Sequence, residues 1–346
     1  MKTKVAVVIL NWNGSEMLKK FLPGLIACSR MDGVEIIVAD NDSKDDSIKM
    51  MQESFPDIRT IVLESNYGFA KGYNQALRKV DAEYYILLNS DVEVTDGWLV
   101  PLISYMDAHP EVAACQPKLR SYRERDCFEY AGAAGGYMDA WGYMYCRGRV
   151  MDSIEKDNGQ YDDIAQVFWA TGAALMVRSA DYWAIDGLDD RFFAHQEEID
   201  LCWRLRSRNR RIVCIPESVV YHVGAATLKR ENPYKTFLNF RNNLLMLYKN
   251  LPEERLNRVM RVRALLDFIA AMQFVAKFKF KDAGAVFRAR REFRRLKPQF
   301  AADRKDNLDE CSVKIIPEQG NFLLIWRYYV CRQHTFQSLF NCDAQG

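Results

Sequence analysis

The N-terminal part of the chain alternates short apolar runs with amphipathic stretches. Four apolar runs predict buried strands, at residues 5–10, 34–40, 58–64 and 84–91. Between them, apolar side chains recur at helical spacing and predict helices at residues 15–22, 43–55 and 70–80. Strands of largely apolar character joined by amphipathic helices are typical of a parallel sheet that is covered on both faces.

Two local signals bear on the ends of the predicted helices. Ser43 is a plausible N-cap for the second helix, because a serine hydroxyl can accept a hydrogen bond from a free backbone N–H of the first turn. Pro23, followed by Gly24, is expected to kink or end the first helix, since proline lacks the N–H that the helix needs.

Polar residues follow three of the predicted strands, at residues 11–13, 40–42 and 89–91. Turn chemistry explains any one of these endings, because Asn, Asp and Ser favour turns. Ligands of parallel sheets bind beyond the carboxyl ends of the strands, however. Three polar endings at the same edge of one sheet therefore favour a binding pocket there.

The pattern becomes irregular between residues 105 and 163. Residues 129–149 are rich in glycine, alanine and aromatic side chains, which suits either a flexible connector or a loop that stacks on a sugar. A strand is predicted again at residues 167–178, a helix at 195–211, and two short strands around Pro216.

From residue 229 onwards the chain is predicted to form long, apolar and basic helices. Residues 229–300 contain 18 Lys and Arg against 6 Asp and Glu, a net charge of +12 in a chain whose total is +2. A basic extension on an acidic body predicts an anionic surface as partner. Residues 264–275 are strongly apolar but fall short of the ~20 residues that span a bilayer. They favour an interfacial amphipathic helix; the alternative is a helix packed on the catalytic domain. No role is assigned to the apolar segment 320–336.

The composition indicates the class of protein and the cellular compartment. The chain has 346 residues, of which 49% are hydrophobic, and this suits two domains or one large α/β domain with an appendage. Its nine cysteines include no CxxC pair, which argues against disulfide frameworks and zinc ribbons and fits a reducing compartment. The apolar run at residues 5–10 is too short for a signal peptide, so a cytoplasmic location is expected. No nucleic-acid partner is expected.

Two groups of residues carry candidate chemistry. Asp91 ends a hydrophobic strand with the hard oxygen that Mg²⁺ and Mn²⁺ prefer, although it could simply cap a turn. Glu197, Glu198 and Asp200 crowd the start of a predicted helix. Adjacent carboxylates raise each other's pKa, which helps to make a general base. Stabilisation of the helix dipole, or an ion pair between Asp200 and Arg204, is the structural alternative.

A third candidate is His222, which ends a β-rich run. A lone histidine is more often a satisfied polar residue than a metal ligand. Its position after the acidic cluster makes metal ligation more plausible.

Taken in order, the segments resemble glycosyltransferase family 2. These are inverting enzymes with the nucleotide-diphospho-sugar transferase (GT-A) fold, and the chain is most similar to the rhamnosyltransferase-like members. The resemblance spans about residues 5–227 and rests on "VVILNWNG", "IIVADNDSKDDS", "ESNYGFAKGYNQAL", "LLNSDVEV", "WATGAALMVR", "EEIDLCWRLR" and "YHVGAAT". It implies a mostly parallel central sheet flanked by helices. We expect a catalytic domain at residues 1–228 and a helical, membrane-associating extension at residues 229–346.

The resemblance also implies roles for single residues. The residues expected to hold the nucleotide are Asn13, Asp40, Asn41, Asn66, Gly68, Gly72, Asn74 and Asn89. Asp91 matches the last Asp of the family's metal motif, and His222 matches a histidine that completes the site in some members, so Mg²⁺ or Mn²⁺ is implied. The first acid of that motif is Asn89 here, which leaves fewer charged ligands. Glu198 stands where the family has an aspartate base. Because this side chain is longer, Glu197 before it and Asp200 after it stay candidates.

The implied reaction is the inverting transfer of a sugar, with rhamnose as the leading candidate, from a nucleotide-diphosphate donor such as deoxythymidine-diphospho-rhamnose. The acceptor would be a hydroxyl of a glycan or lipid-linked molecule in cell-surface polysaccharide assembly, at the inner face of the membrane. A sugar-nucleotide pyrophosphorylase is an alternative, but "NWNGSEM" lacks its glycine-rich phosphate loop. A dehydrogenase is disfavoured because no GxGxxG follows the first strand. The alternative from a different functional class is a non-catalytic protein that binds sugar nucleotides or membrane surfaces.

Overall fold

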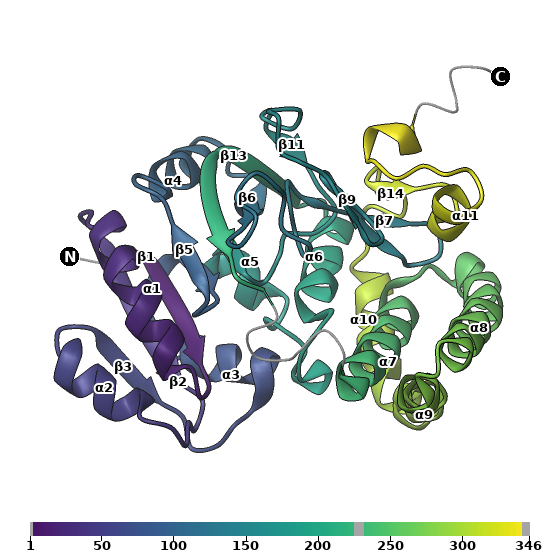
Figure 1. Ribbon diagram of the computed structural model, residues 1–346, viewed down its shortest axis with the longest axis horizontal. Coiled ribbons are helices and arrows are strands. Elements are labelled where there is room, and N and C mark those ends of the chain that lie inside the picture. The colour runs from purple at the N-terminus through teal and green to yellow at the C-terminus, as the bar shows by residue number, and fades with distance from the viewer. Residues whose placement is uncertain (1–2, 225–231, 341–346) are drawn as a thin grey trace.

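A mixed nine-stranded sheet forms the centre of the computed structural model, which describes residues 3–224 and 232–340 (Figure 1). Eight strands follow the order β11-β13-β6-β12-β4-β1-β2-β3, and β5 pairs with β13. Four neighbouring strands come from the N-terminal part and pair in parallel: β1 (Thr3–Asn11), β2 (Val34–Asp40), β3 (Arg59–Val62) and β4 (Ala82–Leu88). The predicted parallel sheet is confirmed in this part of the fold.

Helices cover both faces of this sheet, and each face has its own hydrophobic core. Along β1, Ala6 and Val8 belong to one core, whereas Val5, Val7 and Ile9 belong to the other. Burial on both sides explains why the strand reads as an unbroken apolar run. The first core is completed by α3 (Gly68–Leu77), α5 (Ser179–Ala184) and α6 (Glu197–Ser207), and the second by α1 (Ser15–Cys28), α2 (Ser47–Ser54) and α4 (Leu99–Ala108).

Two expected helix ends are wrong. Helix α1 runs through Pro23 to Cys28, because Pro23 lies on its exposed side while Leu22 and Leu25 stay packed in the core. Helix α2 begins only at Ser47, and Ser43 bonds to the end of the first strand instead of capping this helix.

The remaining strands make the sheet mixed. They are β5 (Val92–Val94), β6 (Val112–Ser121), β11 (Ala165–Gln166), β12 (Ala174–Arg178) and β13 (Arg211–His222). Strand β12 runs antiparallel between β4 and β6. The two short strands expected around Pro216 form the single strand β13, whose register shifts between Ile215 and Val219. This irregularity accommodates a proline that cannot donate to the ladder.

The stretch between residues 105 and 163 is far more ordered than its pattern indicated. It contains β6 and most of a second sheet, formed by β7 (Gly136–Asp139), β8 (Met144–Cys146), β9 (Arg149–Val150), β10 (Ser153–Ile154) and β14 (Gln319–Gly320). A flexible connector is therefore excluded. The unassigned C-terminal segment packs on this sheet, where Leu324 of α11 (Leu324–Tyr329) joins Tyr145 and Val150 in a small core.

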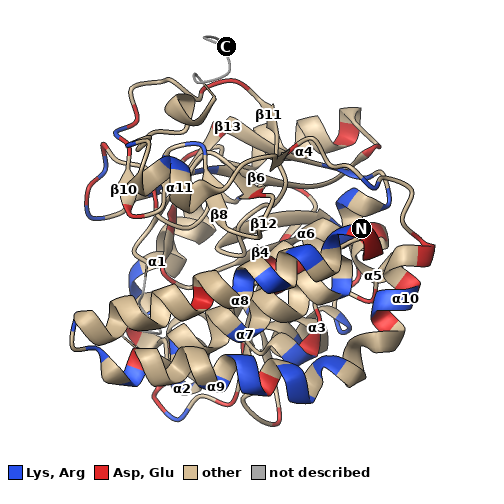
Figure 2. Cartoon of the chain, turned by 90° about the vertical axis from the view of Figure 1, so that its right-hand side faces the viewer, with Lys and Arg blue, Asp and Glu red and all other residues tan. Residues whose placement is uncertain are grey.

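Consecutive helices follow β13: α7 (Pro233–Asn250), α8 (Glu253–Ala276), α9 (Phe280–Leu296) and α10 (Ala301–Asp309). Helices α8 and α9 lie side by side along one face, which carries many Lys and Arg residues (Figure 2). The domain boundary expected after residue 228 lies in residues 225–231, outside the described residues. Within the described parts of the chain, no helix combines the length and the apolar character needed to cross a bilayer.

Candidate active site

The ends of β1 and β2 are joined by a polar network. Asp40, which is buried, accepts hydrogen bonds from the Asn11 side-chain amide (3.0 Å) and from the backbone N–H of Ser43 (2.8 Å). The Ser43 hydroxyl accepts the backbone N–H of Asn13 at 2.9 Å. Asp40 and the exposed Asn13 are thus brought to one edge, as expected. Asn11, which sequence reasoning missed, links them. Its only signal was that it is the first polar residue after the apolar run.

Asn41 holds the loop that precedes α3. Its amide nitrogen donates to the Asn66 side chain (3.1 Å) and to the carbonyl oxygen of Gly68 (3.0 Å), and its oxygen accepts the N–H of Tyr67 (3.0 Å). Both amide hydrogens of Asn41 are therefore used within the protein. Asn41 was expected to hold the nucleotide, but it has no amide hydrogen left to donate to one. Asn66 lies in this loop, where its oxygen also accepts the N–H of Gly68.

The two glycines of α3 allow close packing. Gly68 has φ +75°, and a Cβ there would lie 2.4 Å from the Phe193 ring. A Cβ on Gly72 would lie 2.9 Å from the Leu10 side chain. These contacts explain why the sequence needs glycine at both positions without requiring either residue to touch a nucleotide.

Asn74 is a correction. Its amide nitrogen donates to the Leu188 carbonyl oxygen (2.7 Å) and to Asp190 (2.6 Å), while its oxygen accepts from the Tyr182 hydroxyl (2.6 Å) and the N–H of Leu188 (3.2 Å). An asparagine amide offers two donor and two acceptor positions, and all four are occupied. Asn74 therefore anchors the 188–190 segment instead of contacting the nucleotide.

Asp91, His222 and Asn89 meet at the carboxyl edge of the sheet. The Asp91 carboxylate lies 3.2 Å from His222 Nε2, and the Asn89 amide nitrogen lies 3.4 Å from the same ring atom. The pairing of β5 with β13 creates this contact, because it sets Val92 opposite His222. Two residues that are separated by more than a hundred positions in sequence are thus neighbours, as the resemblance implied.

The other ring nitrogen of His222 faces Glu129, at 3.5 Å. Burial alone would lower the pKa of His222, but its contacts with Asp91 and Glu129 raise it to about 10. A carboxylate behind a histidine fixes the orientation and tautomer of the ring. Sequence reasoning missed Glu129, since nothing in the irregular segment around it distinguished this carboxylate from its neighbours.

Glu197 and Glu198 begin α6. Glu197 is buried and Glu198 is half-buried, and one oxygen of each carboxyl group has no hydrogen-bond partner among the described residues. Burial raises the pKa of Glu198 to about 7. Burial, together with the charge of Glu198, raises the pKa of Glu197 well above its usual value. A carboxyl group whose pKa is raised toward neutral pH is suited to general acid–base chemistry.

Asp200 is a second correction. It is fully buried and accepts from Arg204 (2.8 Å), Lys249 (2.9 Å) and Asn250 (2.7 Å). Although burial would raise its pKa, the charges of Lys249 and Arg204 lower it. A buried carboxylate that is already held by two cations is not available to accept a proton from an acceptor, so Asp200 is excluded as the base.

The segment before α6 is strained and braced. Phe193, His195 and Gln196 have φ of 66°, 70° and 74°, values that L-residues rarely adopt. The Asn242 side chain of α7 donates to the carbonyl oxygens of Phe192, Ala194 and His195 at 2.7–2.9 Å. Asn242 was not predicted, because no local pattern reveals that a later helix holds this segment.

The segment 171–173 connects the acidic pair with the Asp91 cluster. The N–H of Asn89 donates to the Ala173 carbonyl oxygen (3.0 Å). A Cβ on Gly172 would lie 3.7 Å from Glu198 Cβ and 3.3 Å from the Phe69 ring. Glu198 and the Asp91 cluster therefore flank the same three residues at one edge of the sheet.

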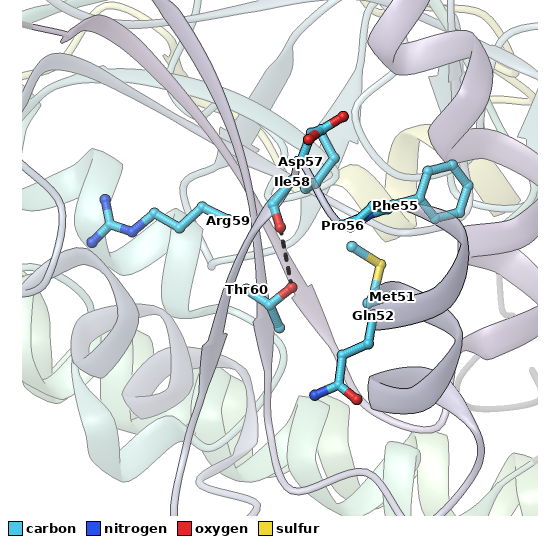
Figure 3. A pocket seen from close by; sticks show the side chains of 8 residues that line it. All are labelled: Met51, Gln52, Phe55, Pro56, Asp57, Ile58, Arg59 and Thr60. Atoms are coloured by element: carbon cyan, nitrogen blue, oxygen red, sulfur yellow. Dashed lines mark hydrogen bonds between the residues drawn. The ribbon is translucent and has the colours of Figure 1, made fainter.

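A separate hollow of about 360 Å³ lies at the outer edge of the sheet, between α2 and β3 (Figure 3). Its lining side chains are those of Met51, Gln52 and residues 55–60. None of the candidate site residues lines it, so we assign it no part in the chemistry.

Residues 6–161 match the family model described as Glycosyl transferase family 2. The N-acetylglucosaminyl-diphospho-decaprenol L-rhamnosyltransferase of Mycobacterium tuberculosis is 23% identical over 249 residues, which cover 67% of this chain and 80% of that protein. Rhamnosyltransferase WbbL of Escherichia coli is 24% identical over 226 residues, which cover 63% of this chain and 83% of that protein. The structure of GalNAc-T7 with UDP, GalNAc and Mn²⁺ has a TM-score of 0.62 at 12% identity, covering 96% of this chain and 57% of that one. This likeness confirms the predicted fold.

Proposed function

Because this chain belongs to glycosyltransferase family 2, we propose that its Glu198 is the base for transfer of a sugar from a nucleotide-diphosphate donor to an acceptor hydroxyl. One observation carries the proposal: Glu198 lies against Gly172, and the next residue, Ala173, bonds to Asn89 of the Asp91 cluster. A base and a site for the donor's diphosphate on either side of one short segment suit a single displacement that inverts the anomeric carbon.

Glu198 takes the proton of the acceptor hydroxyl while that oxygen attacks the sugar. Its pKa of about 7 matches this role, since a base works best when its pKa lies near the working pH. The new bond forms between the acceptor oxygen and the anomeric carbon as the bond to the diphosphate oxygen breaks. Such base catalysis contributes roughly 10²–10⁴-fold. Positioning by the braced 192–196 segment adds to it.

The nucleotide side is formed by Asn13, Asp40, Asn66 and Asn89. These residues lie at or beyond the carboxyl ends of β1, β2 and β4 and in the loop before α3. Gly68 and Gly72 serve by leaving room for close packing. The names of the two rhamnosyltransferase relatives support rhamnose as the sugar. The donor that we propose is deoxythymidine-diphospho-rhamnose.

Asp91 and His222 would hold a divalent cation, Mg²⁺ or Mn²⁺. Their facing atoms are 3.2 Å apart, and a carboxylate oxygen and an imidazole nitrogen are both groups that ligate such ions. No set of three or more His, Cys, Asp or Glu in the described parts of the chain could hold an ion. Diphosphate oxygens would therefore complete the coordination. A bound cation would neutralise charge on the departing diphosphate.

The acceptor is a glycan or lipid-linked molecule in cell-surface polysaccharide assembly. The printed name of the mycobacterial relative includes a diphospho-decaprenol acceptor, which supports a lipid carrier. The net charge of +12 over residues 229–300 suits attraction to anionic lipid. We therefore propose that the protein works at the inner face of the membrane.

A donor screen tests the proposal by measuring release of nucleotide diphosphate with each sugar nucleotide. Wild type should turn over one donor class, and Glu198→Gln should reduce turnover by about 10²–10⁴-fold while donor binding is retained. The matched variant Glu197→Gln should lose less. A protein that only binds sugar nucleotides would show no turnover in wild type and no difference between the two variants. A pyrophosphorylase would instead exchange pyrophosphate.

A further inference from the structure

Helix α8 presents an unpartnered apolar stripe to solvent. Its exposed members recur at helical spacing and are Leu265, Phe268, Ile269, Met272 and Val275. The opposite side of the helix is buried, where Asp267 bonds to Arg263 and Arg290. The buried side attaches α8 to the rest of the protein, whereas the stripe faces solvent.

The stripe continues into the turn between α8 and α9. Residues 277–281 read "KFKFK", and all five are exposed. Phe278 is 82% exposed and Phe280 is 62% exposed, which is unusual for large apolar side chains beside a well-packed core. The turn lies at the left-hand edge of the molecule in Figure 2, where α8 and α9 end side by side.

Phe278 occupies a backbone position that favours glycine. Its φ is 57°, its N–H bonds to the Val275 carbonyl oxygen (2.9 Å), and the N–H of Lys279 bonds to the Phe274 carbonyl oxygen (2.8 Å). This pair of hydrogen bonds is the Schellman ending of a helix, in which the left-handed residue is usually glycine. A phenylalanine there strains the backbone, and its ring packs edge-to-face, at 6.3 Å between ring centres, against Phe280, which is itself exposed. Folding therefore does not explain it.

We propose that the α8 stripe and the 277–281 turn form a docking surface for an anionic lipid bilayer. Phe278 and Phe280 enter the interfacial region, and Lys277, Lys279 and Lys281 contact anionic headgroups. The apolar side chains match the interfacial region of the bilayer, and the cations that alternate with them match its anionic headgroups. A second copy of the chain fits less well, since it would bring the two sets of lysines together. This inference deepens the proposed function. It rests on that function, because a lipid-linked acceptor is the reason for the protein to be at a membrane.

The docking surface is linked to the active site through α7. Arg263 of α8 donates to the Asn243 side-chain oxygen, and the Asn243 amide donates to Gln196 (3.3 Å), the residue before Glu197. Thr236 of α7 donates to Asp282 at the start of α9 (2.6 Å). These bonds hold the docking surface in a set orientation to the acidic pair, so a docked protein would present its site to the membrane at a defined angle.

Vesicle co-flotation tests the proposal, with phosphatidylcholine vesicles and vesicles that contain 30 mol% phosphatidylglycerol. Wild type should bind the anionic vesicles at low salt and less at high salt. Phe278→Gly should reduce bound protein at least five-fold while raising Tm, because glycine relieves the strain. Replacing Lys277, Lys279 and Lys281 together with Gln should also abolish binding.

Two matched control variants remove an exposed apolar side chain or three exposed lysines outside the docking surface. Ile315→Ser removes an apolar residue that is 84% exposed, and Gln at Lys49, Lys305 and Lys314 removes three exposed cations. Both controls should bind vesicles like wild type. Equal loss in the controls, unchanged binding by Phe278→Gly, or a wild-type dimer in sedimentation that Phe278→Gly makes monomeric would overturn the proposal.

Transfer to a short, water-soluble acceptor separates this inference from the proposed function. Phe278→Gly should transfer sugar to the soluble acceptor like wild type and lose activity only on acceptor embedded in anionic vesicles. Absence of transfer by wild type, with vesicle binding intact, would reject the enzymatic proposal and leave the docking surface standing.

Discussion

The backbone N–H of Phe69 donates a 2.6 Å hydrogen bond to the carbonyl oxygen of Phe193. Phe69 is the second residue of α3, and Phe193 lies in the strained segment that leads to Glu197 and Glu198. Gly68 makes this approach possible, because a side chain there would collide with the Phe193 ring. Together with the bonds of Asn74 to Leu188 and Asp190, this contact joins α3 to the segment that precedes the acidic pair.

Replacement of Gly68 by Ala should disturb both sides of this contact at once. The backbone conformation alone should cost about 1–2 kcal/mol of stability, and displacement of Phe193 should lower kcat by at least ten-fold. Gly97→Ala is the matched control, because Gly97 has a similar φ of +69° but no atom within 4 Å of its would-be Cβ. Chemical denaturation and initial rates measure the two effects. An equal loss of kcat in both variants would contradict the coupling.

The pH dependence of turnover should report the carboxyl group of Glu198. Because burial raises its pKa to about 7, kcat should rise with pH and level off above that value. The same shift predicts stability: a carboxyl group whose pKa is higher in the folded state stabilises the fold at low pH, and this contribution is lost as pH rises through 7. Glu198→Gln should therefore raise Tm more at pH 8 than at pH 5. A larger gain at pH 5 would contradict the assignment.

Asp200 should matter for folding far more than a surface acid does. Asp200→Asn leaves Lys249 and Arg204 buried with less compensation, which should cost about 3 kcal/mol of unfolding free energy. Glu53→Gln breaks an exposed ion pair with Lys49 and should change stability by no more than about 0.5 kcal/mol. Urea denaturation compares the two. If folded Asp200→Asn lost turnover without losing stability, Asp200 would have to be reconsidered as a catalytic residue.

Chelation should separate the roles of Asp91 and Glu129. EDTA should abolish transfer by wild type, and Mn²⁺ or Mg²⁺ should restore it. Asp91→Asn should need at least ten-fold more Mn²⁺ for half-maximal activity, because it loses a charged ligand. Glu129→Gln should show a smaller increase, since Glu129 only orients His222 from behind. Full activity of wild type in EDTA would exclude the metal role.

The sequence by itself determined the parallel strands, their order with the helices, and the polar residues that end them. These are local properties: apolar periodicity places a strand or helix, and the strand direction then sends Asn13, Asp40 and Asn89 to one edge of the sheet. The ordered series of motifs indicated the resemblance to glycosyltransferase family 2 for the same reason, because each motif is a short segment whose residues act together.

Only the tertiary structure set Asp200 apart from the other candidate carboxylates and revealed which residues support them. Glu198 and Asp200 are two residues apart on one helix. Lys249 and Arg204 hold Asp200, whereas no cation among the described residues forms an ion pair with Glu198. Asn74 turned out to be an anchor, and Glu129 and Asn242 became visible as positioning residues only in the folded chain. The physical reason is that a side chain's proton affinity and hydrogen-bond partners depend on which distant segments pack against it, and local pattern carries no record of those segments.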